Sequence, residues 1–137
     1  MDTSLLKIMF IDIETVPQTA DFGELPAEMQ HLWEDKFALL QRQTPEKYGT
    51  ETSAAEGYAT NAGIYAEFGR IVCISVGFIY YKDETMHFRT KSFADKEEKK
   101  LLSEFCELIN KFFTSPNHNF CGHNIKEFDI PYICRRM

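Results

Sequence analysis

The apolar positions along the chain fall into runs and stripes that predict alternating strands and helices. Residues 5–13 (LLKIMFIDI) are almost continuously apolar, which predicts a strand buried on both faces, and Pro17 ends it. Residues 70–81 form a second apolar run, and residues 85–93 alternate between apolar and polar positions. Because only the polar turn at residues 82–84 separates the last two segments, we expect them to form an antiparallel hairpin.

Two other stretches carry the helical pattern. Residues 25–43 place apolar side chains three and four positions apart, which predicts an amphipathic helix, and residues 101–113 repeat that pattern. Residues 45–63 are small and polar, and we expect a mobile loop there with one short helix. Residues 18–68 are therefore predicted to be a helical and loop insertion between the first two strands.

The order of these elements predicts the class of fold. Residues 119–122 form a candidate short strand, and a last helix is expected to begin near Asp129 or Pro131. The order is then strand, insertion, two strands, helix, short strand and helix. This predicts a single α/β domain over residues 1–137, with a mixed sheet flanked by helices. A ribonuclease-H-like fold is consistent with this order.

Charge and composition narrow the class of partner. The net charge of −6 argues against a protein that holds duplex DNA through a broad basic face. An acidic chain can still hold the end of a nucleic-acid strand through metal ions, which become the largest local charges. No run approaches the ~20 apolar residues of a membrane helix, and no secretory signal is recognisable. The four cysteines form no CxxC pair, and we expect a cytoplasmic location.

Asp12 and Glu14 are the sharpest chemical feature. Alternate residues of a strand project to the same side, so these two carboxylates are expected to project together from the end of an apolar strand. Carboxylates in such a position are tolerated when they are paired, hydrogen-bonded or bound to a metal ion. The alternative is that the strand simply ends here and water solvates both acids.

Asp129 is a third candidate, two positions before Pro131. A helix can begin at this point, and its amide dipoles favour a negative charge. An ionised carboxylate there could bind a hard cation. The alternative is an ordinary helix cap.

Taken together, these segments resemble the DEDD exonucleases. The sequence FIDIET at residues 10–15 is similar to their first motif, Asp-x-Glu on the first strand. The sequence HNIKEFDIPYICRR at residues 123–136 is similar to their second motif, Asn-x-x-x-Phe-Asp. Within this group the chain resembles the exonuclease domain of family B DNA polymerases and the related stand-alone predicted 3′–5′ exonucleases. Residues 67–78 (EFGRIVCISVGF) are also similar to that group.

The resemblance implies a ribonuclease-H-like fold and an activity with named residues. Asp12, Glu14 and Asp129 would be the catalytic carboxylates and would bind two divalent cations, which the oxygen-only ligands predict to be Mg²⁺ or Mn²⁺. Thr15, Asn124 and Phe128 would contact the substrate. That substrate would be the 3′ end of a single-stranded nucleic acid, with DNA favoured over RNA. Proteins of DNA replication and repair are candidate partners.

The chain departs from the family pattern in one respect. The third motif should follow the second and supply a fourth carboxylate with a Tyr or His, and it is not found after Asp129. We therefore expect a domain cut short at its C-terminus that binds metal weakly and has little activity. One alternative function is a 3′–5′ exoribonuclease or oligonucleotidase. Another is a non-catalytic module that binds nucleic acid or protein on the same fold.

Overall fold

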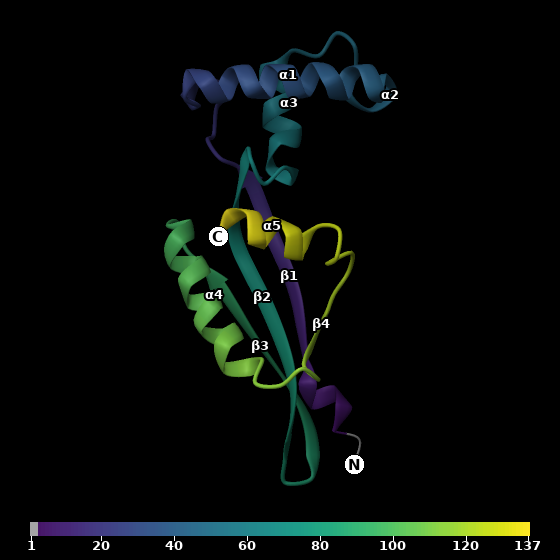
Figure 1. The fold of residues 1–137 in the computed structure, drawn as a ribbon, viewed down its shortest axis with the longest axis vertical. Helices are drawn as coiled ribbons and strands as arrows, with labels where there is room; N and C mark the ends of the chain where they lie inside the picture. Colours follow the sequence, from purple (N-terminus) through teal and green to yellow (C-terminus); the bar gives the residue numbers. More distant parts are fainter. Residues whose placement is uncertain (1–2) are drawn as a thin grey trace. The chain divides into compact units, whose positions relative to one another are not determined.

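The computed structural model describes residues 3–137, which form two compact units. The sheet unit contains the described residues up to Glu14 together with Ile71–Met137, and the helical unit contains Thr15–Arg70. The strands are β1 (Ile8–Pro17), β2 (Gly69–Lys82), β3 (Thr85–Ala94) and β4 (Asn119–Cys121) (Figure 1). The α-helices are α1 (Ala27–Gln43), α2 (Pro45–Tyr48), α3 (Ala54–Asn61), α4 (Glu98–Phe112) and α5 (Asp129–Arg136). No helix among residues 3–137 is both long enough and apolar enough to cross a membrane.

The four strands form one mixed sheet in the order β3-β2-β1-β4. β4 pairs parallel to β1, from Ile8 opposite Asn119 to Phe10 opposite Cys121. β2 and β3 are antiparallel and are joined by a two-residue turn between Lys82 and Thr85. The predicted hairpin and the predicted α/β class with a mixed sheet are both confirmed.

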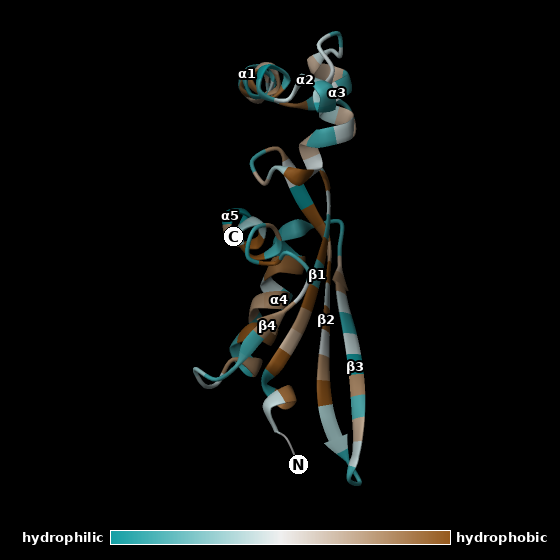
Figure 2. Cartoon of the chain, turned by 90° about the vertical axis from the view of Figure 1, so that its right-hand side faces the viewer, coloured by the Kyte–Doolittle hydropathy of each residue, from teal (hydrophilic) through white to brown (hydrophobic). Residues whose placement is uncertain are grey.

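Within the sheet unit, α4 and α5 lie on one side of the strands (Figure 2). The side chains of Met9, Ile11 and Ile13 are buried, and ring contacts such as that of Phe93 with Phe105, at 6.0 Å between centroids, attach α4 to this side. On β1 the intervening side chains are half-buried at Phe10 and exposed beyond it. The prediction that this strand is buried on both faces is therefore wrong, because no helix among the described residues of this unit covers the second face. We call this second face the open face.

The helical unit has its own aromatic core. The indole of Trp33 is fully buried, stacks on Phe37 at 5.7 Å and meets Phe68 edge-on at 5.2 Å. The buried members of this core are Leu25, Trp33, Phe37, Tyr48, Tyr58, Ala62 and Phe68. The indole N–H also donates to the Ala54 carbonyl at 2.8 Å. The mobile loop expected over residues 45–63 is thus wrong, because buried rings and this hydrogen bond hold α2 and α3 in place.

Gly57 gives a direct test of this packing. A Cβ at this position would overlap the ring of Phe37, which is almost fully buried and cannot move into water. We expect Gly57→Ala to lower the free energy of unfolding by about 1–3 kcal/mol, the usual cost of overpacking. Urea unfolding followed by the fluorescence of Trp33 measures it. Gly23→Ala is the matched control, since nothing lies within 4 Å of its added Cβ. Equal stability of the two variants would show that the ring of Phe37 can shift to make room for the added methyl group.

Candidate active site

Asp12 and Glu14 lie on the open face of β1. Both residues are exposed, and they alternate with the buried residues Ile11 and Ile13. Because side chains alternate along a strand, the two carboxylates project from the same face, as the sequence predicts. The apolar side of β1 therefore fixes the direction of both acids: a slip of one residue would move them into the core.

Asp129 occupies a different environment at the edge of the same strand. It is the first residue of α5, and only 3% of its surface is exposed. Its Oδ2 accepts a hydrogen bond from the backbone N–H of Ile13 at 3.1 Å. Ile13 lies between Asp12 and Glu14, so this hydrogen bond places Asp129 beside the segment of β1 that carries the other two predicted carboxylates.

The edge of β1 is free to receive Asp129 because β4 is short. The pairing between the two strands ends at Phe10 opposite Cys121. At the next residue, Gly122, an added Cβ would lie 2.5 Å from the carbonyl oxygen of Ile11. Only glycine permits this approach of the two backbones. Sequence reasoning did not include Gly122 in the site, and the signal for it was a glycine directly after a short strand.

The chain then turns into α5 at Asn124. The φ angle of this residue is +54°, in the left-handed region that asparagine tolerates better than most residues. Its carbonyl accepts hydrogen bonds from the N–H groups of Glu127 at 3.2 Å and Phe128 at 3.0 Å. This turn delivers Asp129 to the strand edge, which gives Asn124 a structural role.

The electrostatics of the site centre on Asp129. Burial raises the pKa of the Asp129 carboxyl, and the hydrogen bond from Ile13 opposes that rise. The negative charge of Asp12 raises the same pKa further, and His123 lowers it. Asp12 and Asp129 are therefore close enough to repel each other, and a cation between such groups would relieve both the repulsion and the cost of burial.

The predicted substrate residues occupy three different settings. Thr15 follows Glu14 in β1, is half-buried and belongs to the helical unit. Asn124 is exposed, and Phe128 is half-buried with its ring 5.4 Å from that of Tyr132. Contact of these three residues with a substrate stays a prediction.

The carboxylate oxygens are suitable ligands for a hard divalent cation. The side chains do not, however, form a complete coordination shell for it. Oxygen ligands suit Mg²⁺ and Mn²⁺. Among residues 3–137, no three acidic, histidine or cysteine side chains are close enough together to hold a metal ion. Mg²⁺ usually takes one or two carboxylates and completes its shell with water and substrate phosphate. The arrangement of Asp12 and Asp129 is compatible with such an open site.

Comparison with known proteins identifies a family to which most of the chain is similar. The family model of the exonuclease domain of DNA polymerase family B matches residues 47–137. The matched segment includes Asn124, Phe128 and Asp129, whereas Asp12 and Glu14 precede it. No curated protein and no solved structure matches the chain.

Asp129 gives a prediction about stability and pH. We expect Asp129→Asn to stabilise the metal-free chain at pH 7, since the amide keeps an oxygen for the Ile13 N–H and carries no charge to desolvate. The folded-state pKa of Asp129 lies above the unfolded-state value of about 4. The stabilising contribution of the protonated carboxyl is therefore complete below that value and is lost as pH rises through the folded-state pKa.

The advantage of the variant should accordingly be smallest near pH 4 and should grow towards neutral pH. Urea unfolding of both proteins from pH 4 to pH 7 with a chelator measures this difference. Asp35→Asn, at an exposed position of α1, is the control for loss of one negative charge. An advantage that stayed constant or shrank with pH would contradict the burial of the ionised form.

Proposed function

The chain belongs to the exonuclease domain family of family B DNA polymerases, and from this we propose that it is a metal-dependent 3′–5′ exonuclease acting on single-stranded DNA. The observation that carries the proposal is the hydrogen bond of Asp129 to the backbone between Asp12 and Glu14. It brings a carboxylate of the matched segment to the strand whose two acids lie outside that segment. A structural salt-bridge site would need a basic partner, and among residues 3–137 no salt bridge joins Asp12, Glu14 or Asp129 to a basic side chain.

The three carboxylates would hold divalent cations in this proposal. The chemistry that such ions supply to phosphodiester hydrolysis is neutralisation of the phosphate charge and activation of water. Asp12 and Glu14 would contribute oxygens from the open face, where a substrate can approach. Asp129 would contribute from the edge of the strand, where the Ile13 N–H fixes the orientation of its carboxylate.

The surroundings of the carboxylates favour a strand end as substrate. With a net charge of −6, the chain does not attract the long phosphate track of a duplex. The half-buried ring of Phe128 offers a surface on which a terminal base could stack, and the exposed amide of Asn124 offers hydrogen-bonding groups. We include Thr15, beside Glu14 in sequence, as a third substrate contact. Recognition of RNA instead of DNA would require contacts to the 2′-OH.

A cleavage assay tests the proposed function. Because the sequence predicts weak metal binding and little activity, we expect the chain with excess Mn²⁺ to shorten 5′-labelled single-stranded DNA from its 3′ end only slowly, and to shorten it faster than RNA of the same sequence. Asp12→Asn should reduce the rate at least about 100-fold, because outer-shell changes at metal sites already cost 10–100-fold. Product ladders on denaturing gels provide the measurement.

Two controls make the assay specific. Asp35→Asn removes an exposed carboxylate of α1 and should cleave at the wild-type rate. A chelator should abolish cleavage by both proteins. Faster cleavage of RNA would establish the exoribonuclease alternative. Binding of the labelled strand without shortening, with metal present and the chain folded, would support the non-catalytic module.

A further inference from the structure

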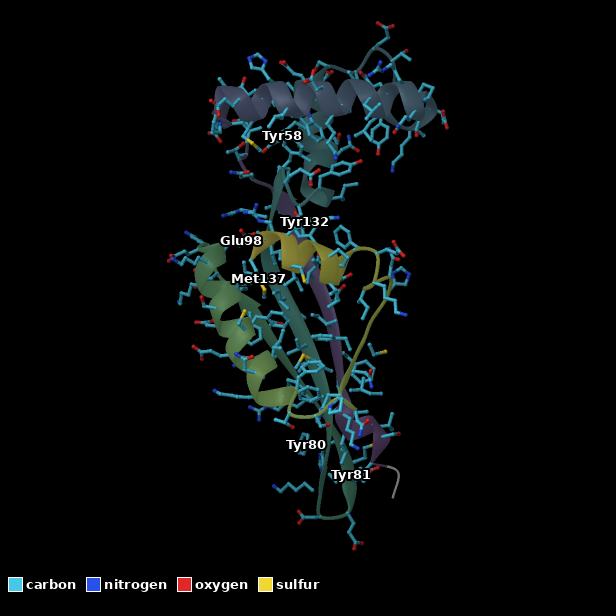
Figure 3. All side chains as sticks on the ribbon, in the orientation of Figure 1. Tyr58, Tyr80, Tyr81, Glu98, Tyr132 and Met137 are labelled. Atoms are coloured by element: carbon cyan, nitrogen blue, oxygen red, sulfur yellow. The ribbon has the colours of Figure 1, made fainter. Side chains whose placement is uncertain are left out.

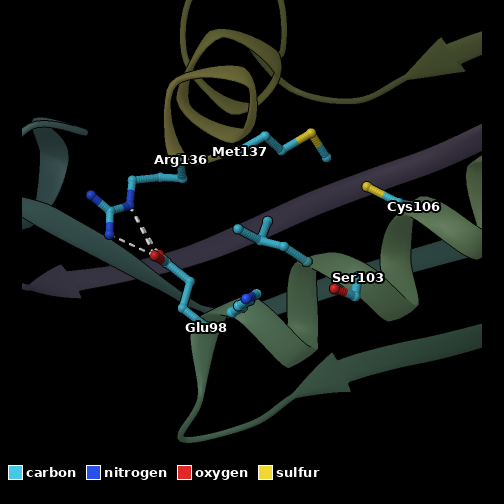
Figure 4. A pocket seen from close by; sticks show the side chains of 7 residues that line it. Glu98, Ser103, Cys106, Arg136 and Met137 are labelled. Carbon is cyan, nitrogen blue, oxygen red and sulfur yellow. Dashed lines mark hydrogen bonds and ion pairs between the residues drawn. The ribbon is translucent and has the colours of Figure 1, made fainter.

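Glu98 and Arg136 form an ion pair away from the three carboxylates. The guanidinium of Arg136 donates from Nη2 to Glu98 Oε1 at 2.6 Å, and from Nε to Oε1 at 3.0 Å and Oε2 at 3.2 Å (Figure 4). The side chain of Arg136 is only 24% exposed and that of Glu98 only 14% exposed. This pair lines a cavity of about 660 Å³ with Leu102, Cys106 and Met137. Such partly buried, multiply bonded pairs are more directional and stronger than surface ion pairs.

Glu98 has a second partner on the sheet. Its Oε2 also accepts a hydrogen bond from the backbone N–H of Ile71, at 2.6 Å. Ile71 is 1% exposed and belongs to β2, whereas Glu98 begins α4 and Arg136 ends α5. One carboxylate therefore joins a strand to two helices. The contact with Ile71 distinguishes Glu98 from an ordinary glutamate in the first turn of a helix.

The same helix, α5, is held at both of its ends. Its first residue, Asp129, accepts a hydrogen bond from the Ile13 N–H on β1. Arg136, in its last turn, forms the ion pair with Glu98. Between them, Tyr132 and Ile133 are buried, and Figure 3 labels Tyr132 on this helix. Apolar burial is non-directional, so it holds a helix against a sheet without fixing its position along the sheet. Hydrogen bonds, which weaken steeply with distance and angle, supply that position.

We propose that Glu98 and Arg136 are positioning residues for the Asp129 carboxylate. Their ion pair fixes the last turn of α5 to β2, and the short, rigid helix transmits that position to its first residue. The proposal rests on the proposed function in one respect, the use of Asp129 as a metal ligand. The contact between Asp129 and Ile13 is a separate consequence that can be measured without any activity.

The test compares two substitutions at Arg136 with a control. Arg136→Met keeps an aliphatic side chain and removes the ion pair. Arg136→Lys keeps the positive charge but lacks the planar guanidinium that donates several hydrogen bonds. Lys100→Met removes the exposed pair of Lys100 with Asp95, whose side chains are 57% and 26% exposed, and is the matched control. Amide hydrogen exchange of Ile13 by NMR reports the hydrogen bond, and Mn²⁺ titration reports metal affinity.

We expect Arg136→Met to accelerate exchange of the Ile13 amide about tenfold while the β2–β3 ladder keeps its protection, because the opening is local. Mn²⁺ affinity should fall about 10–100-fold, as for other groups that orient metal ligands. Arg136→Lys should lie between Arg136→Met and the wild type, and Lys100→Met should match the wild type in both measurements.

The outcomes separate this proposal from the proposed function. If the Ile13 amide of folded Arg136→Met or Arg136→Lys exchanges its hydrogen at the wild-type rate, the positioning role is overturned, whatever the cleavage assay shows. Faster exchange of Ile13 in a chain that cleaves no substrate would support the positioning role and count against the exonuclease. If Arg136→Met does not fold, Arg136→Lys alone decides.

Discussion

A buried carboxylate accepts a hydrogen bond from a strand backbone, and the arrangement of the sheet unit follows from that contact. Asp129 can reach the Ile13 N–H only because β4 leaves β1 after Phe10 and because Gly122 lets the departing chain pass close to β1. The turn at Asn124 then sets the start of α5. Two segments far apart in the sequence thus meet at a single amide.

The buried position of Asp129 lowers the stability of the metal-free chain and would favour the binding of a metal ion. A carboxylate that is 3% exposed and lies near the charge of Asp12 costs free energy in its ionised form. One backbone hydrogen bond offsets only part of that cost, since a typical net contribution is about 1 kcal/mol. A binding site for cations needs such concentrated negative charge, so the feature that weakens the metal-free fold is the one that would bind metal.

The sequence predicts those parts of the fold that follow from the spacing of apolar residues within one strand or helix. The alternation along β1 indicates that Asp12 and Glu14 share a face, and the spacing in α4 indicates its apolar side. The number of covered faces does not follow from an apolar run, which is why the open face is unexpected. The ordered structure of residues 45–63 is also not predicted. Tyr48 and Tyr58 show no helical period in the sequence, and their rings pack on Phe37 and Trp33, respectively, only in the folded chain. The burial of Asp129 likewise depends on a contact distant in sequence.

β3 is the outer strand of the sheet, next to β2. Of its ten residues only Phe93 is buried, and Met86 and Phe88 are more than half exposed. An exposed edge strand, with its row of unpaired backbone groups, can template pairing with a second chain. His87, Arg89 and Lys91 occupy alternate positions along it and are all exposed. Charged side chains on an edge strand oppose such pairing, so Arg89 and Lys91 give β3 a barrier to self-association within its own sequence.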